Sequence, residues 1–390
     1  MTDFTVTPYD VRGTIDYEKL LEQFGADRLT DEQINRFPNP VHPLLRRRQF
    51  YAHRDIDRFC DAIEAKTPHS IVTGRGPSGA MHLGHIIPLY FAKYVQEQTN
   101  ARVYIPFSDD EKFLVKDRTL ETIGEQTRDN LEELLAVGFD PERTRIIIDT
   151  HDADVIYPLA VAFGDAITQS TFNGTYGEPE NIGHSFYPAV QTTHLLLPQL
   201  IHGVHPTLVP IGIDQDPHVR VSRDVASKRR FPVEKPAALL SKFLPRLDGP
   251  GKMSASGDAH ATITLNDDRE SIATKIHTHA VTGGQASKAA HRKHGGDPTV
   301  DVPFGLLQAM FEPDDERLAQ IERDYRDGKL LSGELKSIAI DAINEFLTAH
   351  QKRKTQLGPL ETELARYRLT DEERTTARQR VGHNELKSMN

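Results

Sequence analysis

Short apolar runs alternate with amphipathic stretches from residue 70 onwards. Four runs are strand-like in their apolar content: 70–73, 101–107, 145–149 and 207–213. Between them, apolar residues recur at helical spacing. The clearest stripe contains Leu120, Ile123, Thr127, Leu131, Leu134 and Leu135, and Gly138 is placed to end it. Repeated strand–helix units predict an α/β fold, a Rossmann-like parallel sheet with helices on both faces, whose ligand crevice lies at the carboxyl ends of the strands.

Both ends of the chain lack this alternation. Residues 1–66 are polar and interrupted by prolines, which predicts an N-terminal extension, and residues 67–258 hold the strand–helix units. After about residue 258 only helical patterns remain, so residues 259–390 are predicted to form an all-helical C-terminal domain. Its expected helices are 266–279, 313–326, 333–354 and 370–381. Thr30 and Thr370 each begin a capping box, with Gln33 and Glu373 three positions later.

A glycine-rich segment, TGRGPSGAMHLGH at residues 73–85, joins the first strand-like run to the following amphipathic helix. Such a turn lets backbone N–H groups approach a phosphate closely, and the helix N-terminus adds positive potential. His82 and His85 are three residues apart, so their side chains can face the same bound group. Gly84 leaves space for a flat base to lie against the backbone. The alternative is a loop with two solvated histidines.

A second segment, KMSAS at residues 252–256, follows the glycine-rich loop 248–251. A lysine on such a loop, with two hydroxyls nearby, suits a polyphosphate that gains charge in its transition state. In this order and separation, the two segments resemble the paired signatures of class I aminoacyl-tRNA synthetases. The chain resembles the archaeal and eukaryotic branch of tryptophanyl-tRNA synthetases in four sequence segments: TGRGP (73–77), DDEK (109–112), IDQDP (213–217) and KMSAS (252–256).

The resemblance implies an ATP- and Mg²⁺-dependent ligase that works through an aminoacyl-adenylate. It implies that the catalytic groups are His82, His85, Lys252, Ser254 and Ser256. It implies that the nucleotide is bound by Arg75, Gly76, Pro77, Gly84, Asp214 and Met253. In these roles the histidines hold the phosphates, Arg75 and Lys252 neutralise the pyrophosphate, and Asp214 contacts the ribose. Ala255 stands where many class I enzymes have a second lysine.

The amino-acid end of the site matches the family only in part. Glu111, Gln191 and Gln215 are implied to accept hydrogen bonds from the amino-acid ammonium, although Glu111 could instead cap a helix. The family usually has a tyrosine and a glutamine for the indole N–H, and the matching positions here are Val72 and Pro106. Neither side chain accepts a hydrogen bond. An unpaired buried N–H would cost roughly 1–3 kcal/mol, so Ser108, a water or a changed specificity must compensate.

Composition limits the other function classes. The net charge of −10 argues against a general nucleic-acid binder and fits a salt-rich cytoplasm. Cys60 is the only cysteine, which excludes an internal disulfide and is typical of a reducing compartment. We expect no membrane span, no signal peptide, a cytoplasmic location and no DNA partner. Three basic groups (46–48, 352–354 and 374–380) either meet phosphates or form solvated faces, and the histidine-bearing segments 151–154 and 291–297 are expected to be solvated loops.

The resemblance also implies tRNA as the partner of the helical domain, tryptophan as the amino acid and a homodimer as the assembly. Three alternatives remain open at this point. One is a ligase of the same subclass for tyrosine or another amino acid, and another is a simple adenylyltransferase, although this would not need the helical domain. The third is a non-catalytic paralogue that binds RNA or senses an amino acid, which would have no use for a pyrophosphate clamp.

Overall fold

The computed structural model describes residues 4–7, 11–13, 15–115, 118–253 and 259–382. At its centre is a seven-stranded sheet with the strand order β3-β4-β9-β8-β5-β6-β7. The strands are β3 (Asp27–Arg28), β4 (Phe50–Arg54), β5 (Ser70–Val72), β6 (Arg102–Phe107), β7 (Thr144–Ile148), β8 (Thr207–Gly212) and β9 (Ala237–Ser241). Five neighbouring strands, from β9 to β7, run parallel, whereas β4 is antiparallel to β9 and β3 is antiparallel to β4.

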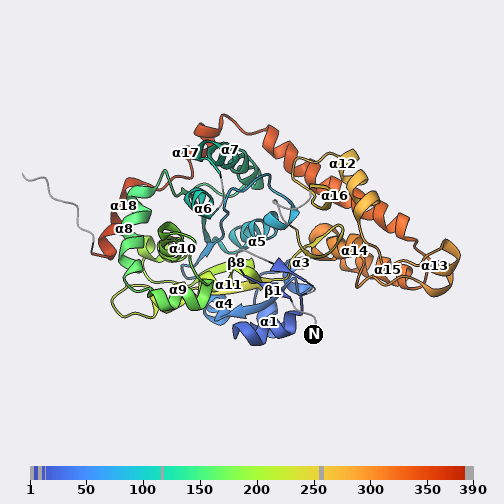
Figure 1. Ribbon diagram of the computed structural model, residues 1–390, viewed down its shortest axis with the longest axis horizontal. Coiled ribbons are helices and arrows are strands. Elements are labelled where there is room, and N and C mark those ends of the chain that lie inside the picture. Colours follow the sequence, from blue (N-terminus) through green and yellow to red (C-terminus); the bar gives the residue numbers. More distant parts are fainter. Residues whose placement is uncertain (1–3, 8–10, 14, 116–117, 254–258, 383–390) are drawn as a thin grey trace, which may run out of the picture.

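Successive side chains of a strand point to opposite faces of the sheet. Helices cover both faces, so the side chains on each face are buried. Ile71 belongs to one apolar cluster and the adjacent Val72 to another. The first cluster includes residues of α4 (Ile56–Ala65), α5 (Leu83–Thr99), α7 (Leu120–Val137), α12 (Arg269–His279) and α16 (Ser332–Thr355). The second includes residues of α1 (Tyr17–Phe24), α8 (Ala153–Gly164), α10 (Ile182–His202), α11 (Asp216–Ala226) and α18 (Asp371–Arg380). The predicted α/β fold is confirmed (Figure 1).

The N-terminal segment does not stand apart from the sheet. Its strand β4 pairs with β9, a connection that the polar, proline-rich sequence did not reveal. Short helices α2 (Asp31–Asn35) and α3 (Pro43–Arg46) flank this strand, and the capping box of Thr30 is present. Strands β1 (Thr5–Val6) and β2 (Val11–Arg12) form a separate pair. The division into three domains therefore remains a prediction, and strand pairing crosses its first boundary.

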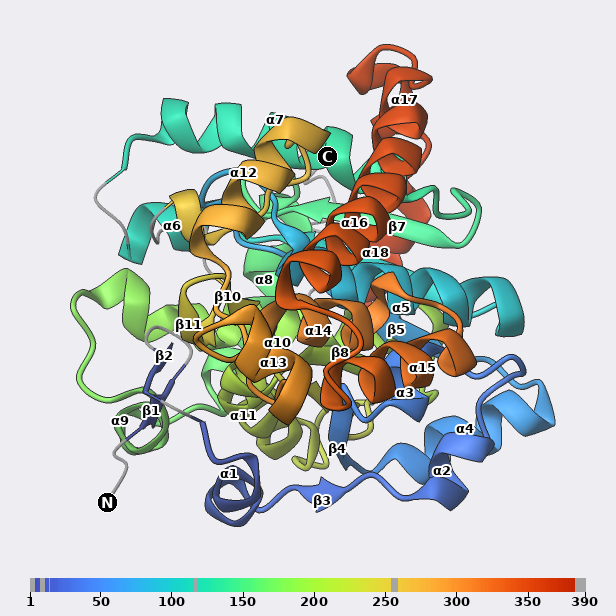
Figure 2. The same cartoon turned by 90° about the vertical axis from the view of Figure 1, so that its right-hand side faces the viewer.

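The C-terminal third is helical, as expected. A third apolar cluster joins α14 (Val302–Leu306), the π-helical turn η3 (Leu307–Phe311), α15 (Asp315–Arg326) and α16. The other described elements of this part are η2 (Ala259–Ala261), α13 (Lys288–His294) and α17 (Leu360–Ala365). The chain then returns to the sheet, since α17 packs against α7, and α18 packs against α8 and α10. Figure 1 shows these last two helices (red) far from α13 and α15, and Figure 2 shows α17 above them.

Most members of the basic groups form ion pairs, although Lys352 and Arg380 are exposed. Arg46 and Arg47 bind Asp315 and backbone carbonyls near the start of α15. In α16, Lys354 binds Glu133 at 2.6 Å. In α18, Arg374 binds Asp152 and Asp154. These arginines and this lysine therefore fasten the helical part to the rest of the molecule.

The expected solvated loops are also partly buried. Asp152, at the end of the loop after β7, is fully buried and accepts hydrogen bonds from the N–H of Ile148 and from Arg368. His291 in α13 is buried and bonds the carbonyl of Leu330 at 2.9 Å. Asp152 and His291 thus depart from the expectation of solvated loops because they act in packing, whereas the other histidines and aspartates of these segments (His151, Asp154, His294 and Asp297) are exposed as expected. Cys60 is buried, and no helix among the described residues is long and apolar enough to cross a membrane.

Candidate functional site

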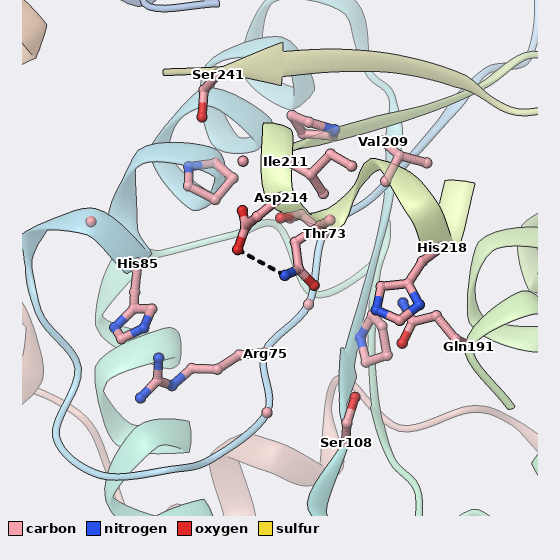
Figure 3. Close-up of a pocket in the computed structure, with 18 of the residues that line it drawn as sticks. Thr73, Arg75, His85, Ser108, Gln191, Val209, Ile211, Asp214, His218 and Ser241 are labelled. Carbon is pink, nitrogen blue, oxygen red and sulfur yellow. Dashed lines mark hydrogen bonds between the residues drawn. The ribbon is translucent and has the colours of Figure 1, made fainter. Parts of the chain in front are cut away.

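A cavity of about 650 Å³ opens at the carboxyl ends of β5, β6 and β8. Of the site residues predicted from the sequence, Pro77 does not line it, and Ser254 and Ser256 lie outside the described residues. All the others line it: Val72, Arg75, Gly76, His82, Gly84, His85, Pro106, Glu111, Gln191, Asp214, Gln215, Lys252 and Met253. Residues from distant parts of the chain thus meet in one place (Figure 3).

The glycine-rich segment continues the sheet pairing beyond β5. The N–H of Arg75 donates to the carbonyl of Pro106 at 2.9 Å, and the N–H of Ser108 donates to the carbonyl of Arg75 at 3.0 Å. At Gly74, a Cβ atom would lie 2.4 Å from the Pro106 carbonyl oxygen. Because no side chain fits in that space, only glycine allows this close approach of the two segments. The approach places the Arg75 side chain inside the cavity.

His82 and His85 cap helix α5 reciprocally. The Nδ1 atom of His82 accepts from the N–H of Gly84, and the Nδ1 atom of His85 accepts from the N–H of His82, both at 3.1 Å. Burial lowers the pKa of His82 to about 3 and that of His85 well below its usual value, and the positive charge of Arg75 adds to both shifts. The rings are therefore neutral. Since Nδ1 accepts in each, the ring proton is on Nε2, which can donate to a bound group.

Arg75 is a buried cation whose charge is not balanced locally. Its guanidinium donates to the side chain of Asn130 and, at 3.0 Å, to the carbonyl of Gly79. Among the described residues, no carboxylate lies within ion-pair distance of it. Burial lowers its pKa to about 9. A buried, unpaired guanidinium is suited to an anionic ligand. Asn130 was not predicted, because it lies among the apolar residues of the α7 stripe.

Asp214 also lines the cavity, and it lies in the 3₁₀ turn η1 (Ile213–Gln215). The carboxylate oxygen Oδ2 accepts from Lys252 at 2.5 Å and from the Gln215 amide at 3.0 Å. The oxygen Oδ1 is buried and has no hydrogen-bond partner among the described residues. Lys252 comes from the hairpin of β10 (Pro245–Arg246) and β11 (Gly249–Lys252). An unpartnered carboxylate oxygen beside a lysine is suited to a ligand that carries both hydroxyls and anionic groups.

Glu111 lies at the start of α6 (Asp109–Val115), directly after β6. Its carboxylate pairs with Lys112 at 2.5 Å. Burial is the largest single effect and raises the pKa of Glu111, but the charge and hydrogen bond of Lys112, together with the nearby His218 and His184, lower it overall. The side chain of Asp110, within the first turn of α6, accepts from the N–H of Glu111 at 2.7 Å. Glu111 is thus an ionised acceptor that faces the cavity.

A buried acidic group lies behind Glu111. Carboxylate oxygens of Asp109, Asp110 and Asp149 lie within 4.8 Å of one another. Burial and the charge of Asp149 raise the pKa of Asp110 to about 8. Tyr157 donates to Asp110 at 2.8 Å, and His194 bonds Asp149 at 2.7 Å. These contacts fix the start of α6, and none of the three carboxylates lines the cavity.

The remaining cavity wall is formed by apolar residues and by polar residues that sequence reasoning missed. Val72 and Pro106 line it, as predicted, together with Val209 and Ile211 of β8. The missed polar residues include Lys112, Tyr176, His184 and His218. His218 could have been found from the sequence, because it directly follows the segment IDQDP and lies in the first turn of α11. Tyr176 could not, because it ends α9 (Gln169–Tyr176), a helix without a marked pattern.

The donor groups of the cavity fit the predicted nucleotide. Arg75, the Nε2–H groups of the two histidines and Lys252 can contact phosphates, and the free Asp214 oxygen can accept from a hydroxyl. The phosphate end of the cavity has no cluster of carboxylates among the described residues. A Mg²⁺ ion would therefore be held mainly by the phosphates themselves, as is common for this ion.

Known proteins resemble the chain over nearly its whole length. The family model described as "tRNA synthetases class I (W and Y)" matches residues 64–348. The chain is 59% identical to tryptophan–tRNA ligase 2 of Halobacterium salinarum, and the match covers 97% of each chain. It is 43% identical to the tryptophan–tRNA ligase of Saccharolobus solfataricus over 92% of this chain and 94% of that protein. The solved tryptophanyl-tRNA synthetase of Giardia lamblia has a TM-score of 0.83 and 34% identity, covering 91% of this chain and 96% of its own.

Proposed function

Because the chain belongs to the class I tRNA synthetases of the W and Y family, we propose that it is a tryptophan–tRNA ligase. The family and the kind of enzyme predicted from the motifs are confirmed. The observation that supports the proposal best is the arrangement of one cavity. Phosphate donors (Arg75, His82, His85 and Lys252) lie at one end, and ammonium acceptors (Glu111 and Gln191) line the same space.

In the first step, a carboxylate oxygen of tryptophan attacks the α-phosphorus of ATP. The bond between this phosphorus and the bridging oxygen breaks, and pyrophosphate leaves with the electron pair. Such a displacement needs positioning and charge stabilisation more than covalent help. His82 and His85 donate Nε2–H bonds to phosphate oxygens, and Arg75 balances the negative charge that develops. Mg²⁺, when bound, adds positive charge at the same phosphates.

Lys252 must exchange partners during this step. In the described structure its ammonium binds Asp214, whose other oxygen is free. A ribose hydroxyl that donates to Asp214 satisfies the free oxygen, and the lysine then reaches the pyrophosphate. Ala255 leaves Lys252 as the cation of the KMSAS segment. Gly84 keeps the entry of α5 free of a side chain, which leaves space for adenine.

Glu111, Gln191 and Gln215 hold the amino-acid ammonium. Glu111 is ionised, so its hydrogen bond to an ammonium is charge-assisted and stronger than one between neutral groups. Gln191 projects from α10 beside His218 (Figure 3). In the second step, a tRNA hydroxyl attacks the carbonyl carbon of the adenylate, and AMP leaves. We propose that the C-terminal helices contact the tRNA and that the enzyme acts as a homodimer.

ATP–pyrophosphate exchange tests the proposal on the purified protein, with each standard amino acid assayed separately at low and high salt. We expect exchange with tryptophan only. Exchange with tyrosine or another amino acid would instead identify a ligase with altered specificity. A folded protein that exchanges with none of them would contradict the catalytic proposal and favour a binding paralogue. Charging of tRNA transcripts then tests the second step, which a simple adenylyltransferase would not perform.

A further inference from the structure

We infer that His218 is the residue that recognises the indole N–H, in place of the tyrosine and glutamine expected at positions 72 and 106. This inference rests on the proposed function. It concerns the part of the cavity whose wall is formed by Val72, Pro106 and Val209, none of which has a side-chain acceptor. Without a partner in this wall, a buried indole N–H would be unsatisfied.

The position of His218 suits this role. His218 lies in the first turn of α11 and lines the cavity, and the residue as a whole is 6% exposed. Figure 3 shows the ring beside Gln191, on the side of the cavity away from His85 and Arg75. An amino acid whose ammonium binds Gln191 and Glu111 would therefore have its side chain within reach of the imidazole.

The ring of His218 is fixed, and one nitrogen remains available. Its Nδ1 atom lies 2.9 Å from the hydroxyl of Tyr176. No hydrogen bond between Nε2 and another described residue is present. Because a hydroxyl can both donate and accept, the Tyr176 contact permits the tautomer with its proton on Nδ1. In that tautomer Nε2 is an acceptor.

The charge state of His218 allows the same role. Burial lowers its pKa to about 4, against the opposing effect of the Glu111 and Asp214 charges. The neutral imidazole has one acceptor nitrogen, whereas the imidazolium has none. The ring is neutral at pH 7, so its Nε2 atom can accept a hydrogen bond from the indole N–H at this pH.

Ser108 is the competing acceptor, since it also lines the cavity. Its hydroxyl rotates about a single bond, so a hydrogen bond to the indole would have to fix that rotation. The His218 ring is already held by Tyr176 before a ligand binds. A preorganised group loses less entropy on binding, which favours His218. The Ser108→Ala variant separates the two assignments.

The test compares tryptophan with 3-benzothienylalanine, an analogue in which sulfur replaces the indole N–H. In ATP–pyrophosphate exchange, we expect the wild-type protein to prefer tryptophan in kcat/KM by at least about tenfold, as the loss of one buried hydrogen bond predicts. In His218→Leu the ratio should fall to within about threefold of unity, mainly through a higher KM for tryptophan. His218→Gln, which keeps an acceptor, should retain part of the preference.

Two controls accompany these variants. Ser108→Ala and His202→Gln should keep the wild-type ratio; His202 lies at the end of α10, before β8 begins. A His218→Leu variant that still prefers tryptophan tenfold, or a Ser108→Ala variant that loses the preference, would overturn the inference. So would a wild-type protein that activates both amino acids equally. If the wild-type protein activates neither, the proposed function itself fails.

A second measurement needs no variant and remains decisive if His218→Leu does not fold. With ¹⁵N-labelled histidine and bound tryptophan, NMR reports which ring nitrogen of His218 carries the proton. We expect the proton on Nδ1 and an unprotonated Nε2. A protonated Nε2 in the tryptophan complex would overturn the inference, because that atom would then have no lone pair to accept.

Discussion

At the scale of single residues, the site works with uncharged histidines. Their neutrality follows from burial, which raises the free energy of the charged form. In each neutral ring, a hydrogen-bond donor that binds one nitrogen leaves the ring proton on the other nitrogen. In His82 and His85, backbone N–H groups occupy Nδ1, so that Nε2 becomes a donor toward the cavity. The sequence predicted these two residues, but not their protonation state.

Two variants of His82 separate its helix-capping role from its catalytic role. His82→Asn keeps a side chain that can cap α5 but lacks the Nε2–H donor. We expect kcat of pyrophosphate exchange to fall about 10²-fold, as for the loss of one transition-state donor, with little change in Tm. His82→Ala should lose both activity and about 1 kcal/mol of stability. Equal Tm values for the two variants would contradict the capping role.

Asn130 positions Arg75 without contributing to the predicted motifs. Asn130→Ala removes the hydrogen bond to the guanidinium, so we expect KM for ATP to rise about tenfold, the effect of one lost hydrogen bond to a charged group. Asn130→Asp should impair ATP binding further, because the new carboxylate would neutralise Arg75. The exposed neighbour Asp129, changed to Asn, is the control. An unchanged KM in Asn130→Asp would show that Arg75 does not contact the phosphates.

At the scale of elements, the site is held together by segments that run beyond their strands. The glycine-rich segment continues to pair with the end of β6, which places Arg75 and Ser108 side by side in the backbone. Helix α18 acts at longer range. Its arginines bind the loop after β7, whose buried Asp152 also accepts from the N–H of Ile148. The basic C-terminal cluster thus stabilises the region behind the cavity.

The role of Arg374 as a structural contact can be tested directly. Arg374→Met removes one of the two arginines that bind the fully buried carboxylate of Asp152. We expect a loss of about 2 kcal/mol in unfolding free energy, because the acceptor loses a charged partner, and no change in KM for tRNA. Arg380→Met, for which no ion pair is found among the described residues, should have little effect on stability. A selective rise in the KM for tRNA would restore the RNA-binding interpretation.

At the scale of the whole molecule, buried histidines couple stability to pH. Burial lowers the pKa of His42, His194 and His218 to about 4. These groups stay neutral in the folded state, whereas in the unfolded chain they titrate near the ordinary histidine pKa of about 6.5. As pH falls below about 6.5, the unfolded state binds more protons, so folded-state stability decreases until pH reaches about 4. Asp110 acts in the opposite direction, since its pKa of about 8 means that the folded state holds a proton that the unfolded chain has lost.

Urea denaturation at pH 7 and pH 5 measures the balance. Because many buried histidines with lowered pKa values oppose a few buried aspartates with raised pKa values (Asp110, Asp149 and Asp301), we expect unfolding free energy to be lower at pH 5 by at least about 2 kcal/mol. His42→Asn removes one titrating ring but keeps an acceptor for the N–H of Leu44. This variant should show a smaller pH dependence than the wild type. Equal unfolding free energy at the two pH values would mean that the buried aspartates fully compensate the effect of the histidines.

The sequence by itself determined the parts that depend on local patterns. Strand and helix periodicity predicted the strands β5, β6, β7 and β8 and the end of α7 at Gly138. The capping boxes at Thr30 and Thr370 are present as predicted. The motif residues meet in one cavity because the carboxyl ends of parallel strands lie at the same edge of the sheet.

Only the tertiary structure decided the features that depend on partners distant in the chain. Strand β4 could not be found from its polar surroundings, since its pairing with β9 spans nearly two hundred residues, as the register of Ala52 with Leu240 shows. Asn130 and Tyr176 belong to no motif, and His218 lies just beyond one; the roles of all three come from the neighbours that folding brings to them. The charge of the basic clusters is visible in the sequence, but whether it is free or paired is not. Pairing depends on which carboxylates lie within a few ångströms, and a linear pattern does not contain that distance.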